Sequence, residues 1–212
     1  MRKSAILWCL WAFLTPAPAV AEYEASRFEL TPLLAYRLGG EFEQPSTGAD
    51  LKLDESKSVG LIFNIRLDAD SQLEIFYSRQ ATELDTEGLF VNQPVLDIDI
   101  DYLHFGGTYA FASDSDLGRP YIVGTLGASR FAPKPSGLDS ETFFSFSFGG
   151  GVNLFPSKRL GLRLEGRLFG TLIDSDNAIF CQTGADTNFC AVSVQGDLLF
   201  QWQAMAGLVV RF

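Results

Sequence analysis

The sequence lacks any continuous run of about 20 apolar residues, the length that one membrane-spanning helix needs. Its one such stretch, residues 5–14, is too short. Basic residues are also few: 16 Lys and Arg stand against 26 Asp and Glu, a formal net charge of −10, which argues against a nucleic-acid partner. Histidine occurs once. The chain is nevertheless 47% hydrophobic, far above the content of a disordered chain.

The first 21 residues have the organisation of a secretory signal peptide. Arg2 and Lys3 form a basic start, residues 5–14 form an apolar core, and Ala19-Val20-Ala21 matches the small-x-small cleavage pattern. We therefore expect cleavage after Ala21. The remaining residues, 22–212, form the single expected domain.

Cysteine is scarce, with three residues, and only Cys181 and Cys190 follow the signal peptide. Two cysteines in an exported chain most simply form one disulfide. A zinc site would need more ligands, and the only histidine, His104, lies far away in sequence. We therefore expect a disulfide and neither a metal ion nor a cofactor.

Apolar residues recur at every second position through most of the chain. In residues 144–154, Phe, Val and Leu alternate with Ser, Gly and Asn, a pattern typical of a strand with one apolar face. The same criterion predicts eight strands: residues 28–38, 58–67, 72–81, 97–111, 119–131, 144–154, 160–172 and 192–212.

The connections between these strands alternate in length. Residues 68–71, 112–118 and 156–159 form short turns, whereas 39–57, 82–96, 132–142 and 173–191 form longer loops. This organisation predicts an all-β protein, an eight-stranded antiparallel up-and-down barrel that spans a membrane. Ten residues tilted by about 40° cover about 25 Å, the height of the apolar band of such barrels. Trp202, ten residues before Phe212 and on the same face, is expected at the opposite interface.

The content of the two faces decides which one meets lipid. One face is almost entirely Phe, Leu, Val and Ile, whereas the other combines small residues with charges of both signs. Small residues and paired charges suit the narrow interior of an eight-stranded barrel, which side chains fill. The expected interior charge network comprises Glu29, Arg37, Arg66, Glu74, Arg163, Glu165, Arg167, Asp197 and Arg211.

Arg163, Glu165 and Arg167 lie together on this face at mid-membrane depth. We interpret them as a salt-bridge network that fills the barrel, with a charged ion path as the alternative. Asp97, Asp99 and Asp101 alternate with apolar residues, so we interpret them as an acidic ladder at the outer end of a strand rather than a calcium loop.

The alternation in residues 97–111 changes parity. Leu103, Phe105 and Tyr109 continue the face that begins with the aspartates. A β-bulge near His104 is the expected cause. An enzymatic role for His104 would require a nucleophile or acids near it. A serine on the same face of this strand would stand at position 106, which is Gly106, and no Gly-x-Ser-x-Gly motif is present. We expect a structural histidine and no enzymatic activity.

The last residues add a resemblance. Leu208, Val210 and Phe212 alternate in the manner of the signal by which the outer-membrane assembly machinery recognises bacterial barrels. The wider chain resembles small eight-stranded proteobacterial outer-membrane barrels of the OmpW, OmpX and opacity-protein type, in particular an "outer-membrane β-barrel domain" family. The matching stretches are residues 102–109, 119–121 with Gly124 and Gly127, 138–142, 144–152, 160–167 and 209–212.

The resemblance implies the cell outer membrane as location, with outer-membrane lipids and the assembly machinery as partners, and we expect a monomer. It leaves three functions open. The first is a non-catalytic barrel with a plugged interior and a structural or surface-contact role. The second is a narrow channel for ions or small apolar solutes, and the third an enzyme acting on lipid A. We expect the first.

Overall fold

The computed structural model describes residues 27–43, 50–85, 95–112, 118–134, 139–155, 157–173, 178–183, 188–193 and 198–212. The expected signal peptide and Asp197 lie outside these residues. Within them, no helix is long and apolar enough to cross a membrane.

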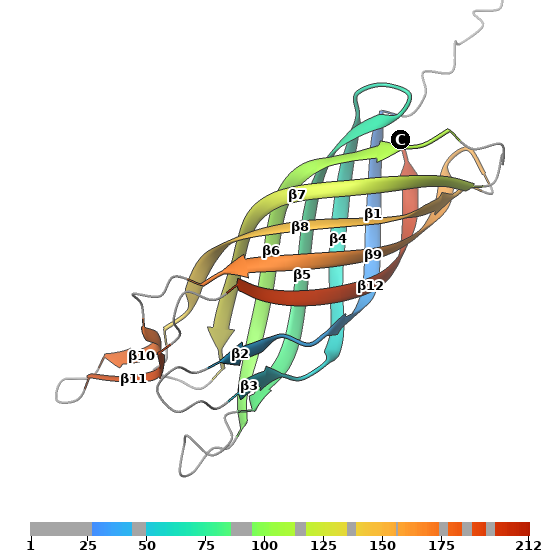
Figure 1. Cartoon of the computed structure of the whole chain (residues 1–212). Coiled ribbons are helices and arrows are strands. Elements are labelled where there is room, and N and C mark those ends of the chain that lie inside the picture. The colour runs from blue at the N-terminus through green and yellow to red at the C-terminus, as the bar shows by residue number, and fades with distance from the viewer. Residues whose placement is uncertain are drawn as a thin grey trace, which may run out of the picture.

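Eight long strands form a closed antiparallel barrel (Figure 1). Each strand pairs with the next one along the chain, and pairing of the first with the last, from Glu29 opposite Arg211 to Leu38 opposite Trp202, closes the sheet. The predicted fold class is therefore confirmed. The barrel strands are β1 (Phe28–Leu38), β4 (Ser56–Arg66), β5 (Ser71–Asp85), β6 (Val95–Ala110), β7 (Gly118–Pro133), β8 (Glu141–Leu154), β9 (Leu160–Leu172) and β12 (Leu198–Arg211).

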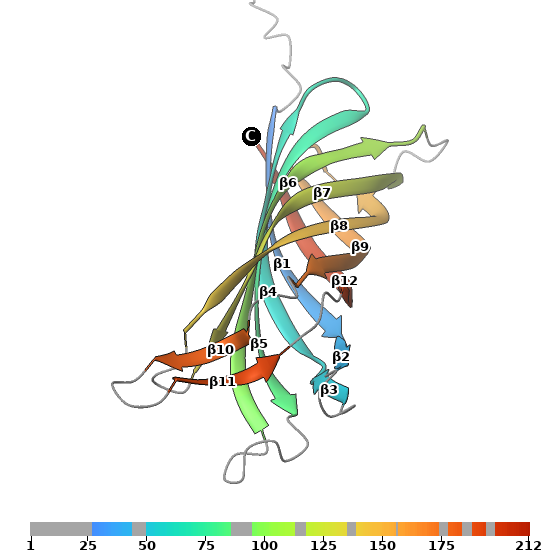
Figure 2. The ribbon, with the colours of Figure 1, turned by 60° about the vertical axis from the view of Figure 1, so that its left-hand side comes forward.

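Four further strands were not predicted. β2 (Glu41–Glu43) and β3 (Asp50–Leu53) form a ribbon that joins the edge of β5, and β10 (Ala178–Thr183) pairs with β11 (Asn188–Ser193). Both pairs lie at the end of the barrel opposite the chain terminus marked C (Figures 1 and 2). The expected last strand, 192–212, was therefore too long, because Val192 pairs with Ile179 in the β10–β11 hairpin and the barrel strand begins only at Leu198.

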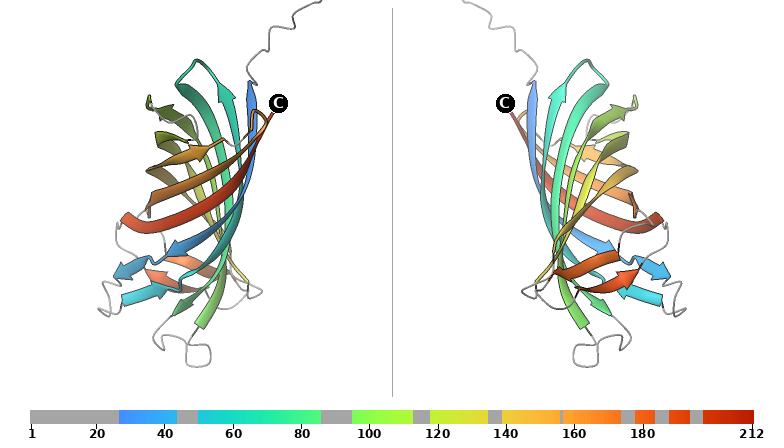
Figure 3. Two further views of the ribbon diagram at one scale, coloured as in Figure 1. Left: turned by 90° about the vertical axis from the view of Figure 1, so that its right-hand side faces the viewer. Right: turned by 90° about the vertical axis from the view of Figure 1, so that its left-hand side faces the viewer.

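The two ends of the barrel differ in their connections (Figure 3). The end that carries Phe28 and Phe212 has the short connections, and we call it the short-turn end; the other is the long-loop end. In the turn after β4, Asp68 Oδ1 accepts hydrogen bonds from the N–H groups of Asp70 and Ser71, at 2.8 and 2.7 Å. These bonds hold the pKa of the Asp68 carboxyl below its ordinary value. At the long-loop end β1 stops because Gly39 and Gly40 adopt φ values of 57° and 142°, which favour glycine.

The predicted β-bulge near His104 is wrong. Strands β5 and β6 pair without interruption from Ser71 opposite Tyr109 to Asp85 opposite Val95. Tyr102 and His104 point inward together with the isoleucines before them, while the aspartates point outward together with Leu103. The side-chain direction does not change along the strand; the surrounding medium does.

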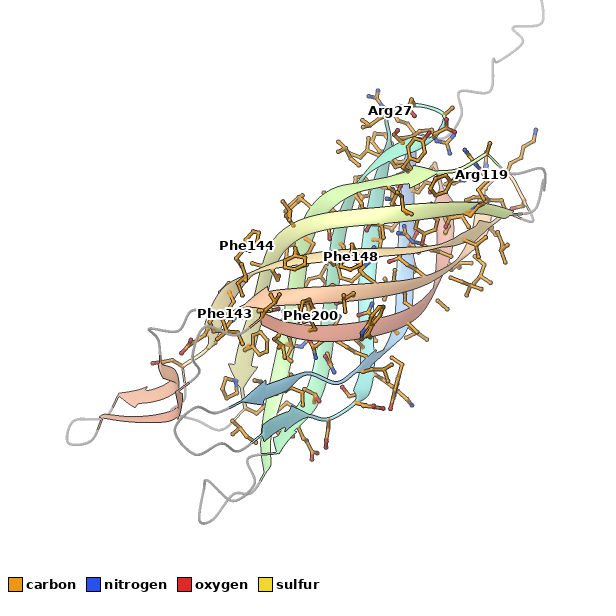
Figure 4. All side chains as sticks on the ribbon, viewed as in Figure 1. Arg27, Arg119, Phe143, Phe144, Phe148 and Phe200 are labelled. Atoms are coloured by element: carbon orange, nitrogen blue, oxygen red, sulfur yellow. The ribbon has the colours of Figure 1, made fainter. Side chains whose placement is uncertain are left out.

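The outer surface carries a band of exposed apolar side chains around the barrel. Figure 4 labels Phe144 and Phe148 on β8 and Phe200 on β12 within it. Such a band is expected where lipid is the solvent. Other exposed members are Leu34, Leu61, Leu73, Leu103, Phe105, Ile122, Leu126, Leu162, Leu164, Trp202 and Leu208.

Candidate functional site: the barrel interior

Four charged side chains form a closed ring of ion pairs inside the barrel. Arg163 Nη2 lies 2.7 Å from Glu74 Oε2, and Arg167 Nη2 lies 2.7 Å from Glu74 Oε1. Both arginines also bind Glu165, each at 2.5 Å. Each of these side chains is at most 3% exposed, and two positive charges balance two negative ones. We call these four residues the ion cluster.

Two neutral side chains donate hydrogen bonds to the carboxylates of the ion cluster. Asn64 Nδ2 donates to Glu74 Oε2 at 3.2 Å, and the Tyr121 hydroxyl donates to Glu165 Oε2 at 2.5 Å. The Arg163 guanidinium lies over the Tyr121 ring, at 4.7 Å from its centroid. The sequence analysis did not single out Asn64 or Tyr121, because neither side chain carries a charge.

An inward glycine allows Glu165 to reach Tyr121. Gly151 on β8 lies directly between Glu165 on β9 and Tyr121 on β7. A Cβ atom at Gly151 would stand only 2.7 Å from the Tyr121 hydroxyl oxygen and 2.2 Å from the Leu164 carbonyl oxygen. The missing side chain therefore lets Glu165 span an intervening strand.

A second layer surrounds Arg37, which is fully buried nearer the long-loop end. Its guanidinium lies against the rings of Tyr102 and Phe169, 4.5 and 4.8 Å from their centroids, and the two rings also contact each other, with centroids 4.7 Å apart. Among the described residues, the Arg37 guanidinium donates hydrogen bonds only to neutral oxygens, whereas Arg163 and Arg167 bind carboxylates. These acceptors are Ser78 Oγ at 2.8 Å, Gln80 Oε1 at 3.3 Å and Gln203 Oε1 at 3.0 Å.

A third group lies at the short-turn mouth. Glu29 Oε1 accepts from Arg66 Nη2 at 3.1 Å and from Arg211 Nε at 2.9 Å. Beside it is a cavity of about 30 Å³, room for about one water molecule, lined in part by Arg66, Arg119 and Arg211. The predicted interior charges therefore lie inside the barrel in three separate places, apart from Asp197, which is outside the described residues.

Beyond the Arg37 layer, most buried side chains at the long-loop end are apolar instead. They include Leu53, Leu96, Ile98, Ile100, Phe131, Phe143, Ile173 and Leu199. On the outer face of the same region, Arg79 Nη2 lies 2.6 Å from Asp99 Oδ2, and the Tyr77 hydroxyl donates to Asp101 at 2.9 Å. The aspartates of β6 thus pair with groups on the outer surface.

His104 makes two hydrogen bonds along the inner side of the barrel wall, to side chains of β7 and β8. Its Nε2 lies 2.7 Å from Ser145 Oγ, and its Nδ1 lies 3.0 Å from Thr125 Oγ1. Ser145 comes from β8, two strands away, and Gly127 stands between the two residues in register. Examination of the His104 strand alone missed this histidine–serine pair, since the serine is distant in sequence. Both side chains are fully buried.

The remaining predicted residues are the interface tryptophan, the residues of the terminal segment and the two cysteines. Trp202, Leu208 and Phe212 are exposed by 57%, 51% and 62%, and all point away from the interior. Cys181 and Cys190 are direct partners in the β10–β11 register. No group of three or more residues that could ligate a metal occurs among the residues that the structure describes.

A closed sheet with an apolar outer band and a polar interior defines the class: a transmembrane β-barrel. The sequence matches no protein-family model and no curated protein. Its fold is nevertheless that of small outer-membrane barrels of known structure. The match to Neisserial surface protein A covers 87% of this chain and 97% of that protein's chain, with a TM-score of 0.57 and 14% sequence identity. The outer membrane protein OprG from Pseudomonas aeruginosa matches 89% and 96%, with a TM-score of 0.52 and 12% identity. Both neighbours are small eight-stranded outer-membrane barrels, and this chain shares their fold.

Proposed function

We propose that the protein is an integral outer-membrane barrel with a closed lumen, and that it has a structural or surface-contact role without catalysis. The observation that carries this proposal is the filling of the interior by two successive layers, the ion cluster and the Arg37–Tyr102–Phe169 stack. The side chains of both layers are almost completely buried.

The two layers would oppose transport for different reasons. An ion that crosses the ion cluster must displace salt bridges between buried partners, and an unpaired buried charge is strongly unfavourable. A solute that crosses the second layer must separate the Arg37 guanidinium from two aromatic rings. An eight-stranded barrel leaves room for little more than its own side chains.

Planar-bilayer recording tests the closed lumen. We expect the purified full-length protein to give no discrete conductance steps in either salt or acid solution. Phe169→Ala removes one wall of the Arg37 stack and serves as the opened control, for which we expect conductance to appear. Steady conductance of the unmodified protein would contradict the closed lumen.

A narrow ion channel is the second candidate, and one observation favours it. Arg167 Nη1 is buried and has no hydrogen-bond partner within the described part of the chain. Buried donors are normally paired, and a permeating water molecule or anion would supply such a partner. If this candidate is correct, Arg167→Gln changes the ion selectivity of a conductance that the unmodified protein already shows.

The proposed absence of catalysis rests on the placement of His104. The histidine and Ser145 form a hydrogen-bonded pair, but both are fully buried in the lumen, where a lipid A molecule in the membrane has no access. We expect His104→Ala to leave the lipid A profile of the cells unchanged. A change in that profile would support the enzyme alternative.

A surface-contact role would reside in the long-loop end, where the β10–β11 hairpin carries the two cysteines. Directly opposed strand residues have Cα atoms about 4.5–5.5 Å apart, within the range of a disulfide. We propose that Cys181 and Cys190 are oxidised. Thiol labelling of intact cells is expected to require prior reduction, and labelling without reductant would exclude the bridge.

We also propose export through a cleaved signal peptide and insertion, as a monomer, by the outer-membrane assembly machinery. The outward, exposed position of Phe212 supports a role for Leu208, Val210 and Phe212 as an assembly signal. Deletion of Phe212 is expected to reduce the amount of assembled barrel and to leave periplasmic aggregates. Normal assembly of the deletion variant would exclude Phe212 as part of the signal.

A further inference from the structure

The outer face of the barrel has two sides that differ in charge. On β4, β5, β6 and β7 the outward-facing residues become charged toward the long-loop end, whereas within the described strands β8, β9, β12 and β1 no outward-facing residue is charged. We call these groups of strands the charged side and the uncharged side; the strand order keeps each group together. The first charged residues on the charged side are Lys57, Arg79, Asp101 and Arg130.

The strand register gives each residue a height along the barrel axis. Residues that pair directly lie on a line perpendicular to the strands. From Phe28, this line passes through one residue of every other barrel strand and returns to β1 at Leu38. With strands tilted by about 40°, each residue adds about 2.5 Å of height, and the line climbs about 3 Å from one strand to the next. Heights on different strands can therefore be compared.

The apolar outer band ends at different heights on the two sides. Measured from Phe28, the last apolar outward residues lie at about 16–23 Å on the charged side and at about 25–32 Å on the uncharged side. They are Val59, Tyr77, Leu103 and Ala128 on the charged side, and Leu38, Phe144, Leu172 and Leu198 on the uncharged side. The band is therefore taller by about 10 Å on the uncharged side.

The edge of the band at the short-turn end is level instead. Its exposed apolar residues have heights that agree within about 3 Å around the barrel. They are Phe28, Leu67, Phe111, Leu160 and Phe212. Tilting the whole barrel in the membrane would raise one side of this level edge and lower the other. A tilt alone therefore cannot fit both edges of the band to a bilayer of uniform thickness.

We propose that the barrel lies in a bilayer of unequal thickness, in which the lipid acyl chains rise about 10 Å higher along the uncharged side than along the charged side. The surface that these chains cover comprises Phe144, Leu172, Leu198 and Phe200, which we call the upper apolar strip. These side chains are exposed by 37–51%, and Figure 4 labels Phe144 and Phe200. The strip continues the lipid-facing band without an intervening charged residue, which favours acyl chains as its occupant.

A bilayer of uniform thickness would surround one side with the wrong medium. A uniformly thin bilayer would leave the upper apolar strip in water. A uniformly thick bilayer would place acyl chains against Arg79, which pairs with Asp99 at 2.6 Å, and against Asp101, which accepts from the Tyr77 hydroxyl at 2.9 Å. Because a local change in bilayer thickness has only a modest cost, the lipid adapts to the protein surface.

Tryptophan quenching by brominated lipids measures how high the acyl chains reach on each side. Trp202 is the only tryptophan after the expected signal peptide, so Trp202→Phe gives a silent background in the exported barrel. In this background, Phe200→Trp on β12 and Ala81→Trp on β5 place outward probes at the same height to within about 1 Å. In vesicles of phosphatidylcholine brominated near the headgroup end of the acyl chains, we expect several-fold stronger quenching and shorter-wavelength emission for Phe200→Trp.

Two further pairs of variants control this comparison. Leu160→Trp on β9 and Phe111→Trp on β6 place probes at the level edge, where we expect equal quenching on both sides. Leu172→Trp on β9 and Lys57→Trp on β4 repeat the first comparison if a variant does not assemble. Leu172 lies about 5 Å higher than Lys57, so stronger quenching of the higher probe cannot arise in a uniform bilayer around an upright barrel.

Three outcomes would overturn the proposal. Equal quenching of Phe200→Trp and Ala81→Trp would indicate a bilayer of uniform thickness. Unequal quenching of the two probes at the level edge would indicate a tilted barrel. If Phe200→Trp were not quenched, or if its quenching decreased as the ratio of protein to lipid increased, a protein partner or a second copy of the chain would cover the upper apolar strip in place of lipid.

Discussion

The long-loop end of the barrel around β5 and β6 is built inside out relative to the short-turn half. In the short-turn half, apolar side chains face outward and the ion cluster lies in the interior, whereas around β5 and β6 at the long-loop end most buried side chains are apolar and charged side chains face outward. Strand β6 contains both arrangements: Asp99 and Asp101 point to the same side as Leu103 and Phe105, while Ile100 and His104 point to the other. The pairing of the strand is continuous throughout.

This contrast shows that each side chain matches its local medium rather than a fixed face of the sheet. Where lipid surrounds the barrel, apolar groups face outward, and paired charges and polar groups face the interior. Where water surrounds it, the ordinary rule for soluble proteins applies, and apolar groups collect inside. The change along β6 therefore marks the level at which the barrel leaves the apolar part of the membrane.

The largest expected effect comes from breaking the ion cluster. Glu165→Ala removes a carboxylate that binds two buried arginines and Tyr121, so it leaves positive charge uncompensated inside the short-turn half. We expect the free energy of unfolding to fall by about 3–5 kcal/mol. Equilibrium urea unfolding of the barrel in lipid vesicles measures this change. An effect well below that range would mean that water reaches the interior freely.

A charge on the outer band tests the lipid-facing side of the comparison. Leu164→Arg places a charge among exposed apolar residues near the middle of β9, where lipid cannot solvate it, and is expected to destabilise the barrel by about 2–4 kcal/mol. The control, Ala81→Arg, adds the same charge to the outer face of β5 beside Asp99, in the long-loop half. We expect the control to fold normally. If Leu164→Arg did not destabilise the barrel, the face that carries Leu164 would not be in contact with lipid.

Two glycines of β7 compare the two faces of the strand: Gly127 lies on the inward face and Gly124 on the outward face. A Cβ atom at Gly127 would stand 2.1 Å from the Leu103 carbonyl oxygen, whereas one at Gly124 would have nothing within 4 Å. Gly127→Ala is therefore expected to destabilise the barrel by about 1–3 kcal/mol. Gly124→Ala is expected to be neutral or to stabilise it by about 0.5–1 kcal/mol. Equal effects in the same unfolding assay would contradict the inward placement of Gly127.

The smallest effect is expected from the charges outside the membrane. Asp99→Asn breaks the ion pair with Arg79, whose side chain is 52% exposed, and exposed pairs contribute little to stability. The change in unfolding free energy is expected to be the least of the four and to disappear at high salt. A large, salt-independent loss would place this pair in a dry environment and remove the contrast between the halves.

The comparison also shows how far the sequence analysis reached. The expected bounds of β1 and β9 coincide with the structure, since each is a complete alternating segment ended by turn residues. The strands β5 and β6 are longer than expected at the long-loop end, because beyond the membrane their outer faces become polar and the alternation no longer resembles that of a lipid-facing strand. The same change of medium produced the mistaken bulge near His104.

By itself, the sequence determined the class of fold, since period-two alternation with an apolar outer face, an even number of strands and short turns at one end are local features. It also identified most of the inward charges. Only the tertiary structure decided which of them meet. The ring around Glu74 joins residues about 90 positions apart in the chain, separated by 89 for Arg163 and 93 for Arg167. The Glu165–Tyr121 and His104–Ser145 contacts each cross a strand over a glycine. Such contacts depend on the register of strands around the closed barrel, and no local pattern in the sequence specifies that register.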